Sequence, residues 1–228
     1  MTQTHLSQII AIDDLRGPAG RLEAVLNTGQ ADAPYAALLC HPHPKGGGTM
    51  HNKVVYHAMK SLSSFGLPTL RFNFRSVGLS EGTFDDGCGE QDDVRAALNW
   101  IETNLKLPIL FAGFSFGSYV GLRACCGDTR VKGLLALGLP VHAEGRDYTY
   151  SFLAQCVQPK LFLSGDHDKY GPVPMVEEVF ATASEPKRLV WIEGAEHFFQ
   201  GTAESPAPKL GLMQQEIGRW LRETFSLN

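Results

Sequence analysis

Two segments of the chain match the pattern Gly-x-Ser-x-Gly, in which a serine hydroxyl can serve as a nucleophile. Residues 113–117 (GFSFG) follow one apolar run and open a second, SFGSYVGLRACC. This context is typical of a strand-to-helix turn that exposes a serine above a sheet. Residues 78–82 (GLSEG) also fit, but the TFDDG that follows them has the composition of a turn. The sequence therefore predicts Ser115 as the nucleophile and Ser80 as a polar loop residue.

A serine is a weak nucleophile without a base, which is usually a histidine oriented by a carboxylate. Two loops that follow strand-like segments supply these groups: GDHD at residues 165–168 and GAEHFF at residues 194–199. Loops that follow parallel strands emerge at the same edge of a sheet, where open α/β folds place their sites. The order serine, acid, histidine is also the one expected after such a turn. We therefore predict Asp168 as the acid and His197 as the base.

Other residues compete for these two roles. Asp168 is preferred over Asp166 because it lies farther beyond the strand and can reach back to His197, whereas Asp166 is predicted to cap the turn. His167 and His142 are weaker base candidates because neither follows the terminal strand. The small and aromatic neighbours of His197 favour an imidazole held in a partly dry cleft.

The elements that must position these residues alternate between strand-like and helix-like segments. Apolar runs predict buried strands at residues 35–40, 67–74, 107–112, 131–137, 160–163 and 188–192. Helical spacing predicts helices at residues 52–65, 91–105, 116–126, 176–183 and 210–221. Residues 9–12 and 22–26 are predicted to form an antiparallel edge pair. The alternation predicts an α/β fold with a mostly parallel sheet and helices on both faces, in a single domain spanning residues 1–228.

The chemistry also needs two backbone N–H groups to hold a developing oxyanion. One is expected from Phe116, after the nucleophile, and the other from the loop that follows residues 35–40. Prolines have no N–H, so His43 is the first suitable donor in HPHP, with Lys45 as the alternative. The His41-x-His43 pair could bind a metal ion, but no acidic residue or third histidine joins it at a telling spacing. We expect His41 to hydrogen-bond inside its loop and predict no metal site.

Composition excludes several other classes of protein. The chain of 228 residues has 20 Lys and Arg against 24 Asp and Glu, a net charge of −4, with no basic cluster for nucleic acid. A hydrophobic fraction of 43% predicts a compact core, while no apolar run reaches the length of a membrane span. The start MTQTHLSQII lacks the features of a secretion signal. Five cysteines without CxxC spacing predict buried free thiols and a cytoplasmic protein.

Two further segments carry a resemblance to a known family. HPHPKGG at residues 41–47 and RFNFRSVGLSEG at residues 71–82 resemble loops of the α/β-hydrolase superfamily, closest to its small bacterial esterase-like and dienelactone-hydrolase-like members. The resemblance covers the chain from Tyr35 to the final helix and departs at Ser76, where glycine is usual. It implies a Ser-His-Asp hydrolase without a cofactor and without a large cap domain. Residues 139–158 would form only a short cap-like insertion.

The expected reaction is hydrolysis of small, short-acyl esters by a carboxylesterase acting through an acyl-enzyme. A peptidase, thioesterase or perhydrolase with the same triad is an alternative, as is a non-catalytic binding protein with this fold. Serine at position 115 argues against the dehalogenase and epoxide-hydrolase chemistry of the superfamily, which needs Asp. The last helix or an edge strand could make a homodimer contact. Candidate substrate-binding side chains, which could equally only pack the insertion onto the sheet, are Val141, Tyr148, Tyr150, Phe152 and Leu153, with Phe198 beside the predicted base.

Overall fold

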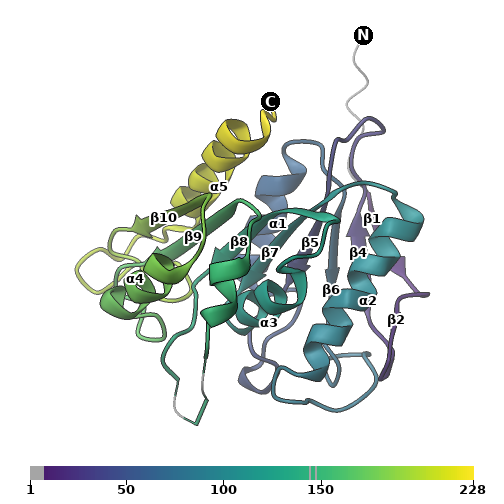
Figure 1. The fold of residues 1–228 in the computed structure, drawn as a ribbon, viewed down its shortest axis with the longest axis horizontal. Helices are drawn as coiled ribbons and strands as arrows, with labels where there is room; N and C mark the ends of the chain where they lie inside the picture. The colour runs from purple at the N-terminus through teal and green to yellow at the C-terminus, as the bar shows by residue number, and fades with distance from the viewer. Residues whose placement is uncertain (1–7, 144, 147) are drawn as a thin grey trace.

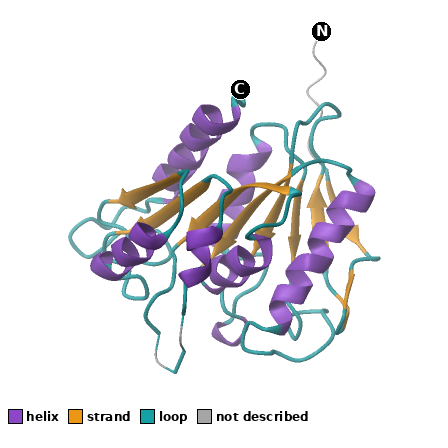
Figure 2. Ribbon diagram, viewed as in Figure 1, coloured by secondary structure: helices purple, strands orange, loops and turns teal. Residues whose placement is uncertain are grey.

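The computed structural model describes residues 8–143, 145–146 and 148–228, and its centre is an eight-stranded sheet (Figures 1 and 2). The spatial order of the strands is β1-β4-β6-β5-β7-β8-β9-β10. Their bounds are β1 Ile9–Ile12, β4 Ala24–Asn27, β5 Ala36–Cys40, β6 Thr69–Phe72, β7 Ile109–Phe114, β8 Val131–Leu137, β9 Lys160–Gly165 and β10 Lys187–Ile192. A separate small hairpin joins β2 (Arg16–Gly17) to β3 (Gly20–Arg21).

The sheet is mostly parallel, as predicted. All neighbours from β6 to β10 pair in parallel, while β4 pairs antiparallel with both β1 and β6. The predicted edge pair is therefore present, although its second strand begins at Ala24 rather than at residue 22. Because β5 to β10 run in one direction, the loops that leave their carboxyl ends emerge at one edge of the sheet.

Five helices cover the two faces of this sheet (Figure 1). Helices α1 (Lys53–Ser63) and α5 (Leu210–Phe225) pack on one face, with the buried side chains of both in one apolar cluster. Helices α2 (Gly89–Asn104), α3 (Phe116–Cys125) and α4 (Val173–Thr182) lie on the other face. Two short 3-10 helices occupy the loops, η1 at Pro44–Gly46 and η2 at Ser151–Gln155.

Because helices cover both faces of the sheet, its strands have continuous hydrophobic runs. In β5, Ala36 and Leu38 belong to the cluster under α2 and α3, whereas Ala37 and Leu39 belong to the cluster under α1 and α5. Side chains alternate between the faces of a strand, so a strand buried on both sides has no polar positions to spare. The sequence pattern of uninterrupted apolar residues follows directly.

Some boundaries differ from those predicted, for local reasons. Helix α4 begins at Val173, three residues before the expected start at Val176. Pro174 is then the second helical residue, a position where a missing N–H costs no helical hydrogen bond. The predicted strand at residues 67–74 is shorter, spanning only Thr69–Phe72. The hairpin of β2 and β3 could not be predicted, because its residues show no apolar alternation.

The cysteines and helices bear on two further expectations. All five cysteines are free thiols, and Cys40, Cys125 and Cys156 are buried, as predicted. Cys88 is exposed, which corrects that prediction, because it lies in the turn that leads into α2. None of the helices in the described part of the chain has both the length and the apolarity to cross a membrane.

Candidate active site

Ser115 stands at a sharp turn between β7 and α3. Its backbone angles are φ 55° and ψ −124°, a conformation that non-glycine residues rarely adopt. The flanking glycines make the turn possible, since a Cβ at Gly113 would lie 2.4 Å from the Gly117 carbonyl oxygen. A Cβ at Gly117 would likewise lie 2.4 Å from the carbonyl oxygen of His41. The motif therefore consists of one strained serine and two positions where the backbone leaves no room for a side chain.

Three polar side chains from different loops meet at this turn. His197 Nε2 lies 2.9 Å from Ser115 Oγ, and His197 Nδ1 lies 2.7 Å from Asp168 Oδ2. The side chains of His197 and Asp168 are 5% and 0% exposed. The structure thus brings together the three predicted residues in hydrogen-bonding sequence, from the ends of β7, β9 and β10. Such an arrangement allows His197 to accept the serine proton while the carboxylate stabilises the resulting imidazolium.

The two acids of the GDHD loop occupy different environments. Asp168 Oδ1 accepts hydrogen bonds from the N–H groups of Tyr170 (2.8 Å) and Gly171 (3.2 Å), which leaves Oδ2 facing His197. Asp166 Oδ1 instead accepts from the Gly194 N–H and lies 2.8 Å from His167 Nδ1. Burial tends to raise the pKa of Asp166, but these hydrogen bonds outweigh it and the pKa is lowered. Asp166 therefore ties two loops together and does not contact His197.

Aromatic rings surround the imidazole of His197. The ring centroids of Tyr170, Phe114 and Phe198 lie 4.7, 4.9 and 5.2 Å from it. Edge and tilted contacts of this kind hold a ring in one plane, in addition to its two hydrogen bonds. Tyr170 also donates its backbone N–H to Asp168, so it contacts both the predicted base and the predicted acid. The other weak base candidates are elsewhere: His142 is exposed, and His167 contacts Asp166.

The backbone N–H groups of Phe116 and His43 have no acceptor among the described residues, as an oxyanion site requires. Phe116 is the first residue of α3, where N–H groups lack helical partners. The N–H of Lys45, the alternative donor, already donates a hydrogen bond to His43 Nδ1 at 3.1 Å. The geometry therefore favours His43 over Lys45 as the second donor.

His41 is buried and fully hydrogen-bonded within its surroundings. Its Nδ1 donates to the Pro42 carbonyl oxygen at 2.6 Å, and its Nε2 accepts the Phe74 N–H at 3.0 Å. Both ring nitrogens are thus occupied, which leaves none for a metal ion. Among the described residues, no three His, Cys, Asp or Glu side chains gather where they could share one. His41 joins the loop after β5 to the segment after β6.

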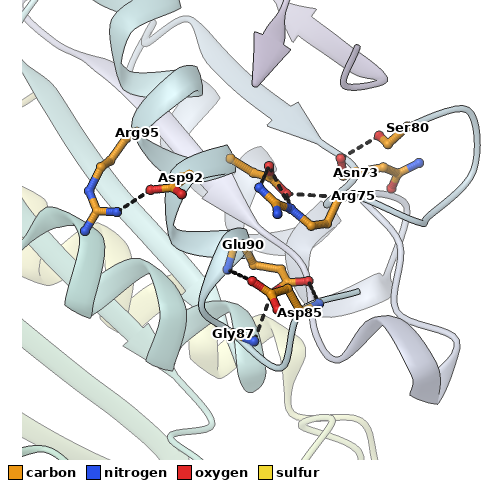
Figure 3. Close-up of polar contacts among 10 residues, drawn as sticks. Asn73, Arg75, Ser80, Asp85, Gly87, Glu90, Asp92 and Arg95 are labelled. Atoms are coloured by element: carbon orange, nitrogen blue, oxygen red, sulfur yellow. Dashed lines mark hydrogen bonds and ion pairs between the residues drawn. The ribbon is translucent and has the colours of Figure 1, made fainter. Parts of the chain in front are cut away.

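The second Gly-x-Ser-x-Gly serine lies in a different hydrogen-bond network (Figure 3). Ser80 Oγ donates to the Asn73 carbonyl oxygen at 2.7 Å and accepts the Glu23 N–H at 2.9 Å. The Ser80 hydroxyl thus donates one hydrogen bond and accepts another, and no histidine contacts it among the described residues. Ser80 is therefore a polar residue of its loop, and the structure adds that it is buried.

Buried charges hold the loop between β6 and α2 (Figure 3). Arg75 donates to both carboxylate oxygens of Asp93, and the nearest ion-pair distance is 2.8 Å. These hydrogen bonds raise the pKa of Arg75. Glu90 accepts the N–H groups of Asp85 and Gly87. The anchored loop carries Phe84, whose ring packs beside the two predicted oxyanion donors, with centroids 5.0 Å from His43 and 5.8 Å from Phe116.

A cavity of about 250 Å³ opens beside Ser115, and we call it the Ser115 cavity. Tyr148 and Phe198, two of the candidate substrate-binding residues, line it. Two other candidates, Val141 and Phe152, do not line it and instead pack against the apolar core under α3. Tyr150 and Leu153 are buried in the same core. The insertion was expected either to line a pocket or to pack on the sheet, and it does both with different residues.

Sequence reasoning missed several residues of this site. Arg146, Tyr170 and Asn52 also line the Ser115 cavity, together with the glycines at positions 46–48. Tyr170 could have been found from its place two residues after the predicted acid. Arg146 had no such signal, because its position depends on how the insertion folds back across the sheet edge.

Acid should weaken the fold through His41. Burial lowers its pKa from 6.5 to about 4, so between these values the unfolded chain binds more protons than the folded one. The contribution of His41 to the free energy of unfolding should then fall by about 3 kcal/mol between pH 7 and pH 4. Urea unfolding across this range measures the slope. His41→Gln should be less stable at pH 7 but show a flatter slope, and an unchanged slope would contradict the assignment.

Most of this chain matches a known protein family. A family model described as an alpha/beta hydrolase domain matches residues 36–222. The chain belongs to the alpha/beta-hydrolase family. The matched span begins at β5 and includes all three residues of the Ser115, Asp168 and His197 constellation. The predicted family is therefore confirmed.

Relatives of this alpha/beta hydrolase are found over nearly the whole chain. An uncharacterised protein of Rickettsia prowazekii is 38% identical over 197 residues, covering 82% of each chain. An alpha-beta serine hydrolase homologue from Coxiella burnetii is 34% identical, with a TM-score of 0.79 over 97% of this chain and 99% of its own. A serine hydrolase without a lid from Xanthomonas campestris is 32% identical, with a TM-score of 0.78 over 96% and 95%. The fold is thus that of an alpha/beta hydrolase without a lid.

Proposed function

We propose that this alpha/beta hydrolase is a carboxylesterase that cleaves small, short-acyl esters through Ser115, His197 and Asp168. The observation that supports this most is the continuous hydrogen-bond chain from Ser115 Oγ through His197 to Asp168 Oδ2. A hydroxyl, a buried imidazole and a buried carboxylate in this order are the groups required for acyl transfer.

The reaction begins when Ser115 Oγ attacks the ester carbonyl carbon as its proton moves to His197 Nε2. The carbonyl oxygen becomes an oxyanion and accepts hydrogen bonds from the N–H groups of Phe116 and His43. Removing one such donor typically costs about 3–4 kcal/mol of transition-state stabilisation. Collapse of this intermediate breaks the bond to the alcohol oxygen, which takes the proton from His197 and leaves. Asp168 stabilises the imidazolium throughout.

Water completes the cycle by the same steps in reverse order. It gives a proton to His197 Nε2 and attacks the acyl carbon, and the new oxyanion is held by the same two N–H groups. Breaking the acyl–Oγ bond releases the carboxylic acid and returns the proton to Ser115. No other co-reactant is needed for the chemistry to balance.

The size of the Ser115 cavity supports short acyl groups. At about 250 Å³ it lies below the usual range of roughly 300–1,000 Å³ for small-molecule sites. Tyr148, Tyr170 and Phe198 provide apolar surface, while Arg146 and Asn52 add polar groups. A long acyl chain would have to leave the cavity and lie on the protein surface.

The test combines active-site labelling with a substrate panel. A fluorophosphonate should form one adduct, located by peptide mass mapping on Ser115, and 4-nitrophenyl esters should show the highest kcat/KM for acyl chains of two to six carbons. Thioesters, peptides and perhydrolysis, assayed in parallel, separate the rival enzymes of the same triad. An adduct on Ser80, or none on folded protein, would contradict the proposal, as would activity that rises steadily toward long-chain lipids.

A further inference from the structure

Three side chains form a wall shared by two neighbouring cavities. His43, Arg146 and Tyr148 line the Ser115 cavity and also a second cavity of about 190 Å³, which we call the Phe84 cavity. The remaining lining residues of the Phe84 cavity are Phe84, Asp86, Phe116, Tyr119 and Gly145. The shared wall therefore lies directly beside the reacting serine and one oxyanion residue.

His43 presents a buried donor without an acceptor in this wall. Its Nδ1 accepts the Lys45 N–H, so a neutral ring carries its proton on Nε2. Burial and the nearby Arg146 lower the pKa of His43 to about 4, which keeps the ring neutral at pH 7. His43 is only 9% exposed, and its Nε2 has no hydrogen-bond partner among the described residues. A buried donor without an acceptor is costly, so an acceptor oxygen that reached His43 Nε2 would be stabilised there.

Positive charge gathers on the same side. Arg146 is exposed, lines both cavities and makes no ion pair with a carboxylate in the described part of the chain. Lys45 Nζ lies 4.5 Å from the centroid of the Phe84 ring, at the edge of the second cavity. Asp86 is the one described acidic residue that lines either cavity. Among the described residues, cations thus outnumber anions around the wall, although the chain as a whole carries a charge of −4.

We propose that this wall binds a carboxylate of the substrate, so that the enzyme prefers monoesters of short dicarboxylic acids to neutral esters of the same length. The guanidinium of Arg146 would bind the carboxylate, and His43 Nε2–H would donate to it, while the ester carbonyl lies at Ser115. Arginine suits this role because its planar fork matches a carboxylate in a bidentate pair. This inference rests on the proposed esterase function and specifies the class of its substrate.

A matched pair of esters tests the preference. Ethyl hydrogen glutarate and ethyl pentanoate have acyl groups of equal carbon number and differ in the terminal carboxylate, and neither needs a chromophore when acid release is followed in a pH-stat. At pH 7.5 the wild-type enzyme should show a kcat/KM for the anionic ester at least about tenfold higher, the scale of a hydrogen bond to a charged group. Glutarate should also slow fluorophosphonate labelling of Ser115, whereas pentanamide, which has the same number of carbons but no carboxylate, should not.

Variants then assign the effect to Arg146. Arg146→Gln should lower kcat/KM for ethyl hydrogen glutarate about 10- to 100-fold, chiefly through KM, and should lower kcat/KM for ethyl pentanoate far less. Arg146→Lys should restore part of the loss. Arg123→Gln is the matched control, because this arginine lies over the rings of Tyr119 and Phe152 but lines neither cavity. It should change neither substrate by more than about twofold.

The outcomes separate this inference from the proposed function. Equal or higher kcat/KM for ethyl pentanoate, or a parallel loss of both substrates in Arg146→Gln, would overturn carboxylate recognition while leaving the esterase intact. Absence of labelling together with no hydrolysis of any ester would overturn both. The role of Arg146 would also be contradicted if glutarate still slowed the labelling of Ser115 in Arg146→Gln.

Discussion

Ser115→Ala is expected to lower kcat/KM for short-acyl esters by about 10⁵- to 10⁶-fold, with the small remainder coming from binding and the oxyanion donors. The reason is that Ser115 Oγ is the hydroxyl that His197 Nε2 contacts, at 2.9 Å. Initial rates with 4-nitrophenyl butyrate give the kinetic effect, and circular dichroism with urea unfolding checks that the variant is folded. Alanine keeps the backbone of the turn, so the fold should survive.

Ser80→Ala is the matched control for that experiment, since Ser80 stands in the same five-residue pattern. It loses hydrogen bonds with Asn73 and Glu23, which should lower the free energy of unfolding by about 1–3 kcal/mol. Its kcat/KM should remain within about twofold of wild type. The assignment of the nucleophile would be wrong if Ser80→Ala abolished activity or Ser115→Ala retained it.

The second large effect is expected from Asp168→Asn, which should lower kcat about 10⁴-fold. Asp168 Oδ1 accepts the N–H groups of Tyr170 and Gly171, so the amide oxygen of asparagine would take that position. Its NH₂ would then face His197 Nδ1 and force the imidazole proton onto Nε2. In that tautomer Nε2 cannot accept the proton of Ser115. Measurement of kcat from pH 6 to pH 10 quantifies the loss.

Asp166→Asn provides the comparison for this change, because it makes the same replacement in the same loop. Asp166 contacts His167 and the Gly194 N–H but not His197, so kcat should fall less than about tenfold. The variant should instead lose a modest amount of stability. If the two variants lost activity equally, or if Asp166→Asn lost more, the carboxylate assignment would have to be reversed.

Much of the site could be predicted because the fold converts order along the chain into position in space. Parallel strands place their carboxyl ends at one edge, so three loops found by their residue types and by the strands before them had to meet. The choice between two serines followed from the apolar helix that begins at Phe116. The choice between two acids followed from reach, and the structure gives Asp168 the contact with His197.

The insertion at residues 139–158 shows where such reasoning ends. Its aromatic residues have no periodicity that separates those facing a cavity from those facing the core. Tyr148 lines the Ser115 cavity, whereas Phe152 packs on the core, although both are large aromatic residues of one loop. The direction of each side chain depends on contacts with α3 and with the loop that holds Tyr170. The carbonyl oxygen of Tyr170 accepts hydrogen bonds from the N–H groups of Val141 and His142.

The sequence by itself determined the alternation of strands and helices, the turn at Ser115 and the order of the three polar loops, since these depend on local patterns and on a few glycines. Only the tertiary structure decided which side chains share the Ser115 cavity, which distant backbone groups bond to Ser80 and His41, and that Arg146 stands beside His43. These contacts join residues far apart in the chain, and their geometry depends on how whole layers pack. Local propensity carries no information about such distances, which is why the wall of the site had to be read from the fold.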